Sequence, residues 1–234
     1  MKILERASPN FNDRPPGVPV DILVLHYTGM PTAEEALERL CDPVAQVSAH
    51  YTVGEDGTVY HHVAEDRRAW HAGVASWAGE TDVNGRSIGV EIVNPGHEFG
   101  YRPFPEVQMT SVAALCRGIV ARHAIPACRV VGHSDVAPDR KRDPGELFDW
   151  RGLAGAGVGL WPSNAGLGSG AGLDIAGFQA GLRRYGYGCP DSGTLDDATR
   201  TVVASFQRHF RPSAIDGRPD AECAAILSAL LKAM

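Results

Sequence analysis

Two short apolar runs that each lead to a histidine constrain this chain more than any other feature. The first, Ile22–Leu25, runs directly into His26, and the second, Arg129–Val131, leads through Gly132 to His133. Continuous runs of this kind are typical of strands buried on both faces of a sheet. We therefore expect an α/β fold in which a central mixed sheet, flanked by helices, presents both histidines at strand ends.

The segment that follows His133 is expected to be a stiff loop, because two prolines fix φ within it. Such a loop can hold Lys141 and Asp143 beside His133. Histidine and carboxylate are both zinc ligands, and three protein ligands leave the fourth position to water, as in catalytic zinc sites. His26, His133 and Asp143 are therefore the candidate ligands of one Zn²⁺ ion per chain.

A third predicted strand, Ser87–Val93, carries a candidate group for proton transfer. Its aliphatic residues alternate onto one face, which leaves Glu91 on the other face beside Gly89. Gly89 has no side chain to obstruct the carboxylate, and a glutamate with free space beside it is a candidate general base. The alternative is an ordinary strand glutamate, which is solvated or paired in a salt bridge.

Five segments of the chain resemble the zinc N-acetylmuramoyl-L-alanine amidases of the AmpD/AmiD type, which are relatives of the peptidoglycan-recognition proteins. They follow the family's order and span roughly the first two-thirds of the chain. The segments are Val24–Thr28, Ser48–Tyr51, Arg68–Gly73, Ser87–Glu91 and Gly132–Trp150. The resemblance implies an enzyme that hydrolyses the amide between N-acetylmuramic acid and L-alanine in muropeptides.

The same resemblance implies roles for individual residues. It makes Glu91 the proton carrier and Lys141 the residue that stabilises the oxyanion, although a charged run such as the one around Lys141 is normally solvated surface. It suggests that His50, Trp70 and His71 line the substrate groove, whereas each could also be a buried or bracing residue. The other histidines match no motif and are expected to be structural or surface residues: His61, His62, His97, His123 and His209.

Local signals predict further elements of the first two-thirds of the chain. A capping box opens a helix over Ala33–Cys41. Ser48–Val53 and Thr58–Val63 flank a short Asp-Gly turn and predict a hairpin. Apolar residues at helical spacing predict a long helix over about residues 105–122. The proline-rich residues 7–20 are expected to be an extended lead-in.

Composition along the chain predicts two domains. Residues 1–158 are the expected zinc amidase catalytic domain, and the glycine-rich residues 159–173 are the expected flexible linker. Residues 174–234 show three helical patterns and resemble the small three-helix peptidoglycan-binding module, although three such helices can also be a stabilising lobe. We expect this module to contribute to binding rather than chemistry. A chain ending near Gly159 should then still hydrolyse small muropeptides, provided that it folds.

Charge and composition argue against several classes of partner. The formal net charge of −6 disfavours nucleic acid, and no apolar run approaches the roughly 20 residues of a membrane-spanning helix. The N-terminus shows no signal-peptide core, and the five cysteines lack CxxC spacing, which suits reduced thiols. These features predict a cytoplasmic protein, and the resemblance implies that its partners are muropeptides or peptidoglycan fragments.

A cytoplasmic amidase would meet imported wall fragments, so we expect a role in recycling anhydro-muropeptides. Loss of the enzyme could then alter the induction of β-lactam resistance where such fragments are the signal. Two alternatives stay open: a cell-wall-lytic amidase that acts on intact peptidoglycan, and a sensor that binds peptidoglycan without cutting it. The retention of all three expected ligands together with Glu91 and Lys141 argues against the sensor. The sequence leaves stem-peptide preference and oligomeric state open.

Overall fold

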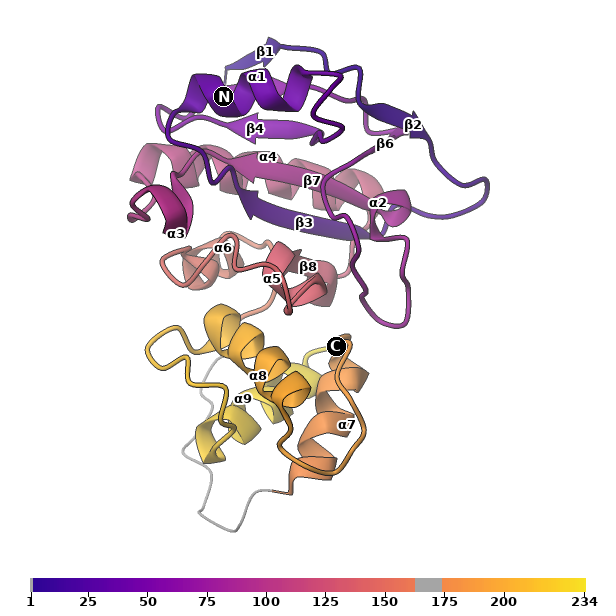
Figure 1. Cartoon of the computed structure of the whole chain (residues 1–234), viewed down its shortest axis with the longest axis vertical. Helices are drawn as coiled ribbons and strands as arrows, with labels where there is room; N and C mark the ends of the chain where they lie inside the picture. Colours follow the sequence, from indigo (N-terminus) through magenta and orange to yellow (C-terminus); the bar gives the residue numbers. More distant parts are fainter. Residues whose placement is uncertain (1, 163–173) are drawn as a thin grey trace.

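A six-stranded sheet with helices on both faces forms the larger part of the molecule, and three further helices pack against one side of it (Figure 1). The computed structural model describes residues 2–162 and 174–234. The sheet is mixed, because one strand pair is antiparallel and the other four are parallel. This confirms the predicted fold class, a mixed sheet flanked by helices and followed by a small helical region.

The strand that carries His26 lies inside the sheet, whose order is β1-β5-β4-β7-β3-β8. β3 (Ile22–Tyr27) pairs in parallel with β7 (Ser87–Ile92) on one side and with β8 (Val130–Gly132) on the other. Its first five residues are buried, which explains the continuous apolar run. His133 follows β8 as predicted, but it begins the short helix α5 (His133–Val136) rather than a loop.

The other half of the sheet contains the predicted hairpin. β4 (Tyr51–Val53) and β5 (Val59–His61) are antiparallel, and β4 also pairs in parallel with β7. The edge strand β1 (Ile3–Glu5) pairs in parallel with β5. The hairpin therefore joins the first residues of the chain to the strand that carries Glu91.

A small second sheet was not expected from the sequence. β2 (Phe11–Asp13) pairs antiparallel with β6 (Arg67–Ala69), within the stretch that was expected to be an extended lead-in. All three residues of β2 are exposed, so they carry no alternation of apolar and polar side chains. A strand of this kind is defined by its partner and leaves no local pattern to detect.

The predicted helices cover the two faces of the sheet. α4 (Glu106–His123) packs its apolar stripe on one face, and α1 (Ala33–Cys41) lies over the other with the predicted capping box intact. Together with α4, the alternating aliphatic residues of β7 form one core cluster. The remaining short helices of this part are α2 (Val83–Arg86), α3 (Gly96–Phe99), the 3-10 helix Ala127–Arg129 and α6 (Trp150–Gly155).

The last three helices are those predicted from the sequence: α7 (Ile175–Tyr185), α8 (Asp197–Phe210) and α9 (Ala221–Lys232). Their apolar side chains share one continuous core with the side of the sheet formed by β3 and β8, because Val131 and Val136 belong to the same buried cluster as Leu182 and Phe206. The helical module is therefore packed onto the sheet and does not form a separate core. Residues 163–173 of the predicted linker lie outside the described residues.

The loop after β6 also contacts the module. Trp77 is 1% exposed and packs edge-on against Tyr187, with ring centroids 4.9 Å apart. The backbone N–H of Ala78 donates a hydrogen bond of 2.7 Å to the carbonyl of Gly186. A Cβ atom at Gly186 would lie 2.5 Å from Trp77 Cε2, so only glycine allows this approach. The loop after β6 and the segment Gly186–Tyr187 of the helical module are therefore in close direct contact.

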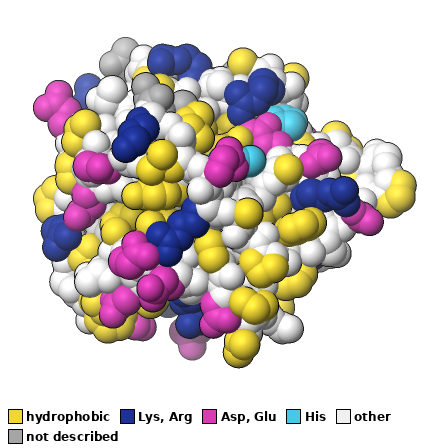
Figure 2. Space-filling view, turned by 90° about the horizontal axis from the view of Figure 1, so that it is seen from above, with side chains coloured by type: hydrophobic (Ala, Val, Ile, Leu, Met, Phe, Trp, Pro, Cys, Tyr) yellow, Lys and Arg dark blue, Asp and Glu magenta, His cyan; other side chains and the backbone are white. Residues whose placement is uncertain are grey.

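One face of the molecule carries mixed side chains, and the cysteines are unpaired. Figure 2 shows a face on which acidic, basic and apolar side chains are interspersed. Among the described residues, no helix combines the length and the apolar character needed to cross a bilayer. All five cysteines of the chain lie in the described ranges and are free thiols.

Candidate metal centre and active-site cleft

The register of three parallel strands brings the expected functional residues to one place. His26 on β3 is directly paired with Glu91 on β7, and Leu25 is paired with Gly132 on β8. The residue after Gly132 is His133, so it emerges beside His26. Side chains of paired residues point to the same face of a sheet. The strand register therefore makes His26, Glu91 and His133 neighbours.

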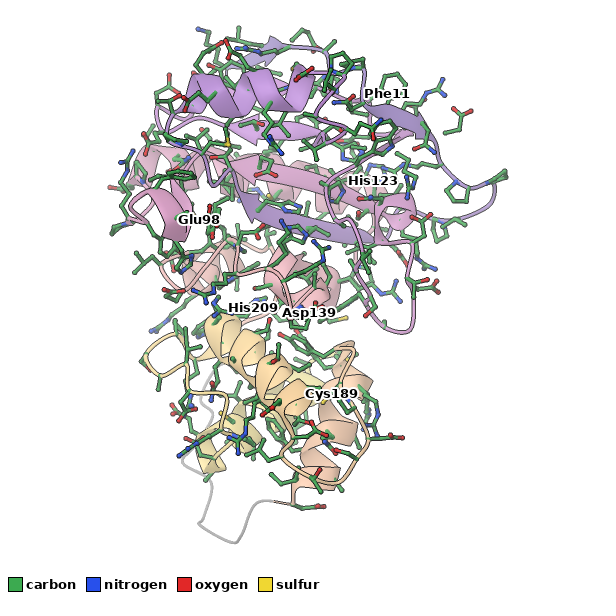
Figure 3. The ribbon with its side chains drawn as sticks, in the orientation of Figure 1. Phe11, Glu98, His123, Asp139, Cys189 and His209 are labelled. Atoms are coloured by element: carbon green, nitrogen blue, oxygen red, sulfur yellow. The ribbon has the colours of Figure 1, made fainter. Side chains whose placement is uncertain are left out.

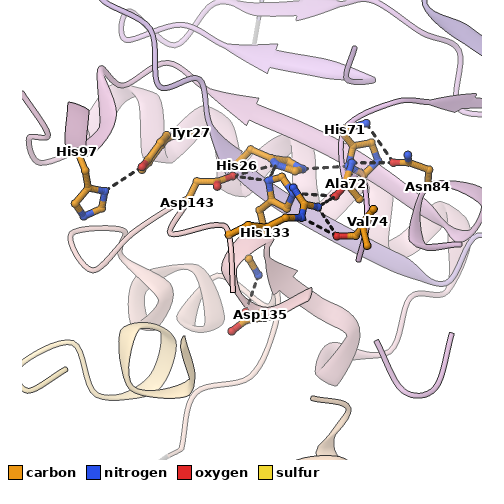
Figure 4. Close-up of polar contacts among 12 residues, drawn as sticks. His26, Tyr27, His71, Ala72, Val74, Asn84, His97, His133, Asp135 and Asp143 are labelled. Carbon is orange, nitrogen blue, oxygen red and sulfur yellow. Dashed lines mark hydrogen bonds and ion pairs between the residues drawn. The ribbon is translucent and has the colours of Figure 1, made fainter. Parts of the chain in front are cut away.

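The three expected metal ligands meet in a compact triangle of donor atoms (Figure 4). His26 Nδ1 lies 2.9 Å from His133 Nδ1 and 3.1 Å from Asp143 Oδ2, and His133 Nδ1 lies 3.0 Å from the same oxygen. All three residues are buried. Ligands around a tetrahedral zinc at about 2.0–2.2 Å stand roughly 3.3–3.6 Å apart. Shifts of roughly half an ångström would therefore accommodate the ion.

The second nitrogen of each histidine has a partner outside the triangle. His133 Nε2–H donates to the carbonyl of Ala72 at 3.1 Å, which leaves Nδ1 free of a proton. His26 Nε2 lies 3.1 Å from His71 Nδ1, and His71 Nε2 lies 3.1 Å from Ser87 Oγ. A chain of donors running outward in this way leaves both Nδ1 lone pairs facing the triangle. Such outer contacts fix the tautomer and ring orientation of metal-binding histidines, so the residues fit a bound metal.

Burial and neighbouring groups keep His26 and Asp143 in the protonation states that metal binding needs. Burial, together with the neighbouring His133, lowers the pKa of His26 to about 4. Burial alone would raise the pKa of Asp143, but the contacts with His133 and His26 outweigh it and hold that pKa well below its usual range. Metals bind neutral histidine and ionised carboxylate. The site is therefore prepared to bind a metal at neutral pH.

Glu91 lines the cleft next to this triangle and has an oxygen without a partner. Its Oε2 is buried and makes no hydrogen bond to any described residue. Burial, and then the charge of Asp143, raise the pKa of Glu91 well above its ordinary value, while Lys141 opposes the shift. A carboxyl group with an uncommitted oxygen and a perturbed pKa is suited to taking up and returning a proton.

A cleft of about 630 Å³ opens beside the metal site. Trp70 and His71, which were expected to line the substrate groove, lie at this cleft together with Lys141. His97, which was expected to be a structural or surface residue, lines it as well. The ammonium group of Lys141 has no hydrogen-bond or ion-pair partner among residues 2–162 and 174–234. The other polar or flexible lining residues include Tyr27, Met30, Arg39, Glu98, Arg140 and Arg142.

His50 does not reach this cleft. It is 0% exposed, and its Nδ1 accepts a hydrogen bond of 3.0 Å from the backbone N–H of Gly89. Its Nε2 lies 3.1 Å from the carbonyl of Arg67. Burial, and then the charge of Arg14, lower the pKa of His50 to about 3. His50 therefore braces β7 from behind, and the expectation that it lines the substrate groove is wrong.

Gly89 makes room for a different side chain than expected. A Cβ atom at this position would lie 2.4 Å from Cγ of His71, so the space beside Glu91 is filled by the His71 ring. That ring packs edge-on against His26, with centroids 5.1 Å apart. A glycine inside a strand often marks a close approach of another group, and this was the signal available in the sequence.

Sequence reasoning missed the residues that hold the loop after β6 in place. The Asn84 side-chain oxygen accepts hydrogen bonds from the backbone N–H groups of His71 and Ala72, at 3.1 and 2.9 Å. The guanidinium of Arg140 donates to the carbonyls of Ala72 and Val74. These contacts join segments distant in sequence, so no local pattern predicts them.

Comparison with known families matches both parts of the chain. The family described as N-acetylmuramoyl-L-alanine amidase matches residues 16–146, which include all three residues of the triangle and Glu91. The family described as putative peptidoglycan binding domain matches residues 172–227, which include most of the three C-terminal helices.

Two kinds of characterised relative differ in how much of the chain they match. N-acetylmuramoyl-L-alanine amidase AmiD of Escherichia coli K12 is 37% identical over 232 residues, covering 91% of this chain and 83% of AmiD. 1,6-anhydro-N-acetylmuramyl-L-alanine amidase AmpD of Salmonella typhimurium SL1344 is 34% identical over 160 residues, covering 61% of this chain and 83% of AmpD. The likeness to AmiD therefore extends further along the chain than the likeness to AmpD.

Solved structures give the same picture. AmiD of E. coli in complex with the substrate anhydro-N-acetylmuramic acid-L-Ala-D-γ-Glu-L-Lys has a TM-score of 0.82 at 36% identity, covering 94% of this chain and 92% of that one. AmpDh3 of Pseudomonas aeruginosa in complex with anhydromuramic pentapeptide has a TM-score of 0.79 at 34% identity, covering 90% of each chain. Both structures therefore match this chain across the sheet and the helical module.

Proposed function

This chain belongs to the N-acetylmuramoyl-L-alanine amidase family, and we propose that it uses one zinc ion, held by His26, His133 and Asp143, to hydrolyse the amide between N-acetylmuramic acid and L-alanine. The observation that supports this most strongly is the buried triangle of two Nδ1 atoms and one carboxylate oxygen at the cleft that Glu91 lines.

Zinc is the metal that we propose for this donor set. Two imidazoles and one carboxylate, with the fourth position open, are a ligand set of catalytic zinc sites. A bound zinc ion would polarise the amide carbonyl and lower the pKa of a water molecule. The protein residues around it then have to move one proton and stabilise one negative charge.

Glu91 is the proposed proton carrier. Its free Oε2 would take a proton from the water as the oxygen attacks the carbonyl carbon. When the carbon–nitrogen bond breaks, the same carboxyl group would return that proton to the amine of L-alanine. The raised pKa supports both steps, because it brings the neutral and ionised forms of Glu91 closer in free energy at neutral pH.

Lys141 is the proposed stabiliser of the oxyanion. Its ammonium group lines the cleft, and it acts on the pKa of Glu91 as a nearby positive charge. A preorganised cation placed where charge develops stabilises a transition state by several kcal/mol. Trp70 and His71 are the proposed substrate contacts. Trp70 Nε1–H donates to Asn12 Oδ1 at 2.7 Å, which holds the half-buried indole as one wall of the cleft.

The proposed substrates are anhydro-muropeptides released for recycling. This follows from the relatives, since AmiD and AmpDh3 were captured with anhydromuramic peptides and AmpD is named for the 1,6-anhydro form. We propose a cytoplasmic location, which the five free thiols support because disulfides are rare in that compartment. Loss of the protein should then make anhydro-muropeptides accumulate in the cell and alter β-lactamase induction where they are the signal.

A second candidate substrate is intact peptidoglycan. The match of residues 172–227 to a peptidoglycan-binding domain favours it, as does the likeness to AmiD over most of the chain.

Parallel digests of three substrates distinguish these functions. The purified, zinc-loaded full chain is incubated with an anhydro-muropeptide, the matching reducing muropeptide and intact sacculi, with the Glu91→Gln protein as the inactive control. A recycling enzyme gives its highest kcat/KM on the anhydro form, and a lytic enzyme releases stem peptides from sacculi at a comparable rate. Binding without any product would identify a sensor. Recovery of untagged protein in the periplasm or outer membrane would contradict the cytoplasmic assignment.

A further inference from the structure

A buried carboxylate lies two residues after the expected ligand His133. Asp135 is the third residue of α5 and is 1% exposed. Its Oδ2 accepts a hydrogen bond of 2.7 Å from the backbone N–H of Gly132, the residue that precedes α5 (Figure 4). This bond fixes the backbone on both sides of His133, and hence the direction in which the imidazole leaves the chain.

The C-terminal helices supply the other partners of this carboxylate. His209 Nδ1 lies 2.7 Å from Asp135 Oδ2, and Tyr187 donates its hydroxyl to Asp135 Oδ1 at 2.7 Å. A carboxylate can only accept hydrogen bonds, so Nδ1 of His209 carries the proton. Ser205 donates its hydroxyl to the carbonyl of Ser134 at 2.7 Å. Figure 3 labels His209 at the end of α8 that faces the sheet.

These contacts extend to a second expected ligand. The backbone N–H of Ser134 donates to the carbonyl of Asp143 at 2.9 Å. The C-terminal helices therefore hold a turn, α5, that carries His133 and is also hydrogen-bonded to the backbone of Asp143. Two of the three donor atoms in the triangle depend on the position of this turn.

The amidase part alone supplies the Asp135 carboxylate with too few hydrogen-bond donors. From that part, Oδ2 receives one donor, the N–H of Gly132. A buried carboxylate without enough donors is strongly unfavourable, so removing the module partners would favour a movement of α5 that exposes Asp135 to water. The ring of His209 is itself fixed, since it stacks between Trp150 and Phe210 with centroids 3.7 and 3.8 Å away.

We propose that the C-terminal module is a positioning element of the metal site: His209 and Tyr187 hold Asp135, and Asp135 holds His133 in its ligand orientation through Gly132. The inference rests on the proposed metal site of His26, His133 and Asp143. It assigns the module a role in the chemistry, in addition to any role in binding peptidoglycan. It also explains why the module shares a core with the sheet.

The test uses three variants of the full chain. His209→Leu removes the N–H donor and keeps an apolar side chain between the stacked rings. His209→Asn keeps an N–H donor, because the amide nitrogen of Asn is bonded to Cγ in the same way as Nδ1 of His. Thr199→Val is the matched control. It lies on the same helix, is 0% exposed, and loses one buried hydrogen bond of 2.7 Å, from Gln179, that does not involve Asp135.

Two properties of the metal site are measured, neither of which is enzymatic activity. The dissociation constant for zinc is determined by competition with a chelator, and the visible absorption spectrum is recorded for the cobalt(II)-loaded protein. We expect His209→Leu to weaken zinc binding about tenfold or more and to change the cobalt spectrum, because outer partners of ligands typically contribute 10- to 100-fold to metal affinity. His209→Asn should stay within about threefold of the unmodified protein on the same scale. Thr199→Val should lower the melting temperature without changing either property.

The results separate this inference from the proposed function. Unchanged zinc affinity and cobalt spectrum in folded His209→Leu overturn the inference alone, and so does an equal loss of affinity in Thr199→Val. If the unmodified protein binds no zinc, the metal site and the inference both fail. Should His209→Leu not fold, Tyr187→Phe provides the same comparison, since it removes the 2.7 Å hydrogen bond to Asp135 Oδ1 and leaves only the longer contact of 3.4 Å from the Ser205 hydroxyl. A Tyr187→Phe protein with unchanged zinc affinity and cobalt spectrum then overturns the inference.

Discussion

His26 and Glu91 are register partners on the neighbouring parallel strands β3 and β7. One ladder of backbone hydrogen bonds therefore sets the distance between an expected metal ligand and the expected proton carrier. A slip of one residue would turn one of the two side chains to the opposite face of the sheet. The relative position of these two groups is thus a property of the sheet, and the loops need only supply Asp143 and Lys141.

Alanine in place of His26, His133 or Asp143 should remove metal and activity together, because two protein ligands hold zinc poorly. Metal content per chain is measured by elemental analysis after dialysis. His123→Ala is the control, since His123 bonds to Glu65 away from the triangle. A His26→Ala protein that retained one zinc per chain would show that the ligand set is wrong.

Glu91→Gln should keep the fold and the zinc but lower kcat by about 10²- to 10⁴-fold, the usual contribution of a general acid–base group. The amide keeps the size of the carboxyl group and cannot take up a proton at neutral pH. Zinc content and turnover of a soluble muropeptide are measured on the same preparation. Turnover within a few-fold of the unmodified enzyme would rule out Glu91 as the proton carrier.

Lys141→Ala should lower kcat by roughly 10²- to 10³-fold, as expected for loss of one group that stabilises an oxyanion. Zinc content should remain at one per chain, because Lys141 is not a ligand. The informative comparison is between the loss of kcat and the loss of zinc content. A protein that loses its zinc in proportion to its activity would place Lys141 in the support of the metal site instead.

Gly89→Ala should destabilise the protein and weaken zinc binding, because the added Cβ would overlap the His71 ring that contacts His26. Overpacking of this kind typically costs about 1–3 kcal/mol. The double variant Gly89→Ala/His71→Ala should regain most of the melting temperature while zinc affinity stays low. If the double variant is no more stable than Gly89→Ala alone, the overlap with His71 is not the cause.

The zinc-free protein should lose stability as the pH falls from about 6.5 to about 4. Burial lowers the pKa of His50 to about 3 and that of His62 to about 4, both below the unfolded value of 6.5. Below pH 6.5 the unfolded chain binds protons that the folded chain does not, so the free energy of unfolding decreases. Each histidine contributes up to about 1.4 kcal/mol per pH unit.

Urea unfolding at several pH values measures this slope. His62→Gln, which removes one of these histidines, should give a shallower decrease between pH 6.5 and 4. His26 and His71 act in the same direction, because burial lowers the pKa of each. A free energy of unfolding that stays constant over this range would contradict the buried, neutral state of these histidines.

Much of the fold could be predicted because its signals are local. The apolar run before His26, the capping box of α1 and the Asp-Gly turn each depend on residues a few positions apart. The strands β1 and β2 could not be predicted, since both are three residues long and exposed. Their position depends on partners about 55 residues away in the chain, which sequence patterns do not report.

The site residues also fall into those that local motifs predict and those that depend on tertiary contacts. The ligand triangle follows from motifs at the ends of predicted strands, whereas the place of His50 depends on what packs against β7 and was misjudged. The contact between Asp135 and His209 joins residues 74 positions apart, so His209 had no motif to identify it. The expectation that the module is dispensable for chemistry was made without knowledge of the shared core, which is visible only in three dimensions, and it stays a prediction.

Hydrolysis of one defined muropeptide in ¹⁸O-enriched water tests the central claim most directly. The zinc-loaded protein is incubated with anhydro-N-acetylmuramyl-L-Ala-D-γ-Glu-L-Lys, and the products are identified by mass spectrometry. We predict that the bond between the lactyl carbonyl and L-alanine is cut, that one ¹⁸O atom enters the lactyl carboxylate, and that the free peptide begins with an unlabelled L-alanine amine. No cleavage by protein with one zinc per chain, or ¹⁸O in a carboxylate of the peptide, would contradict it.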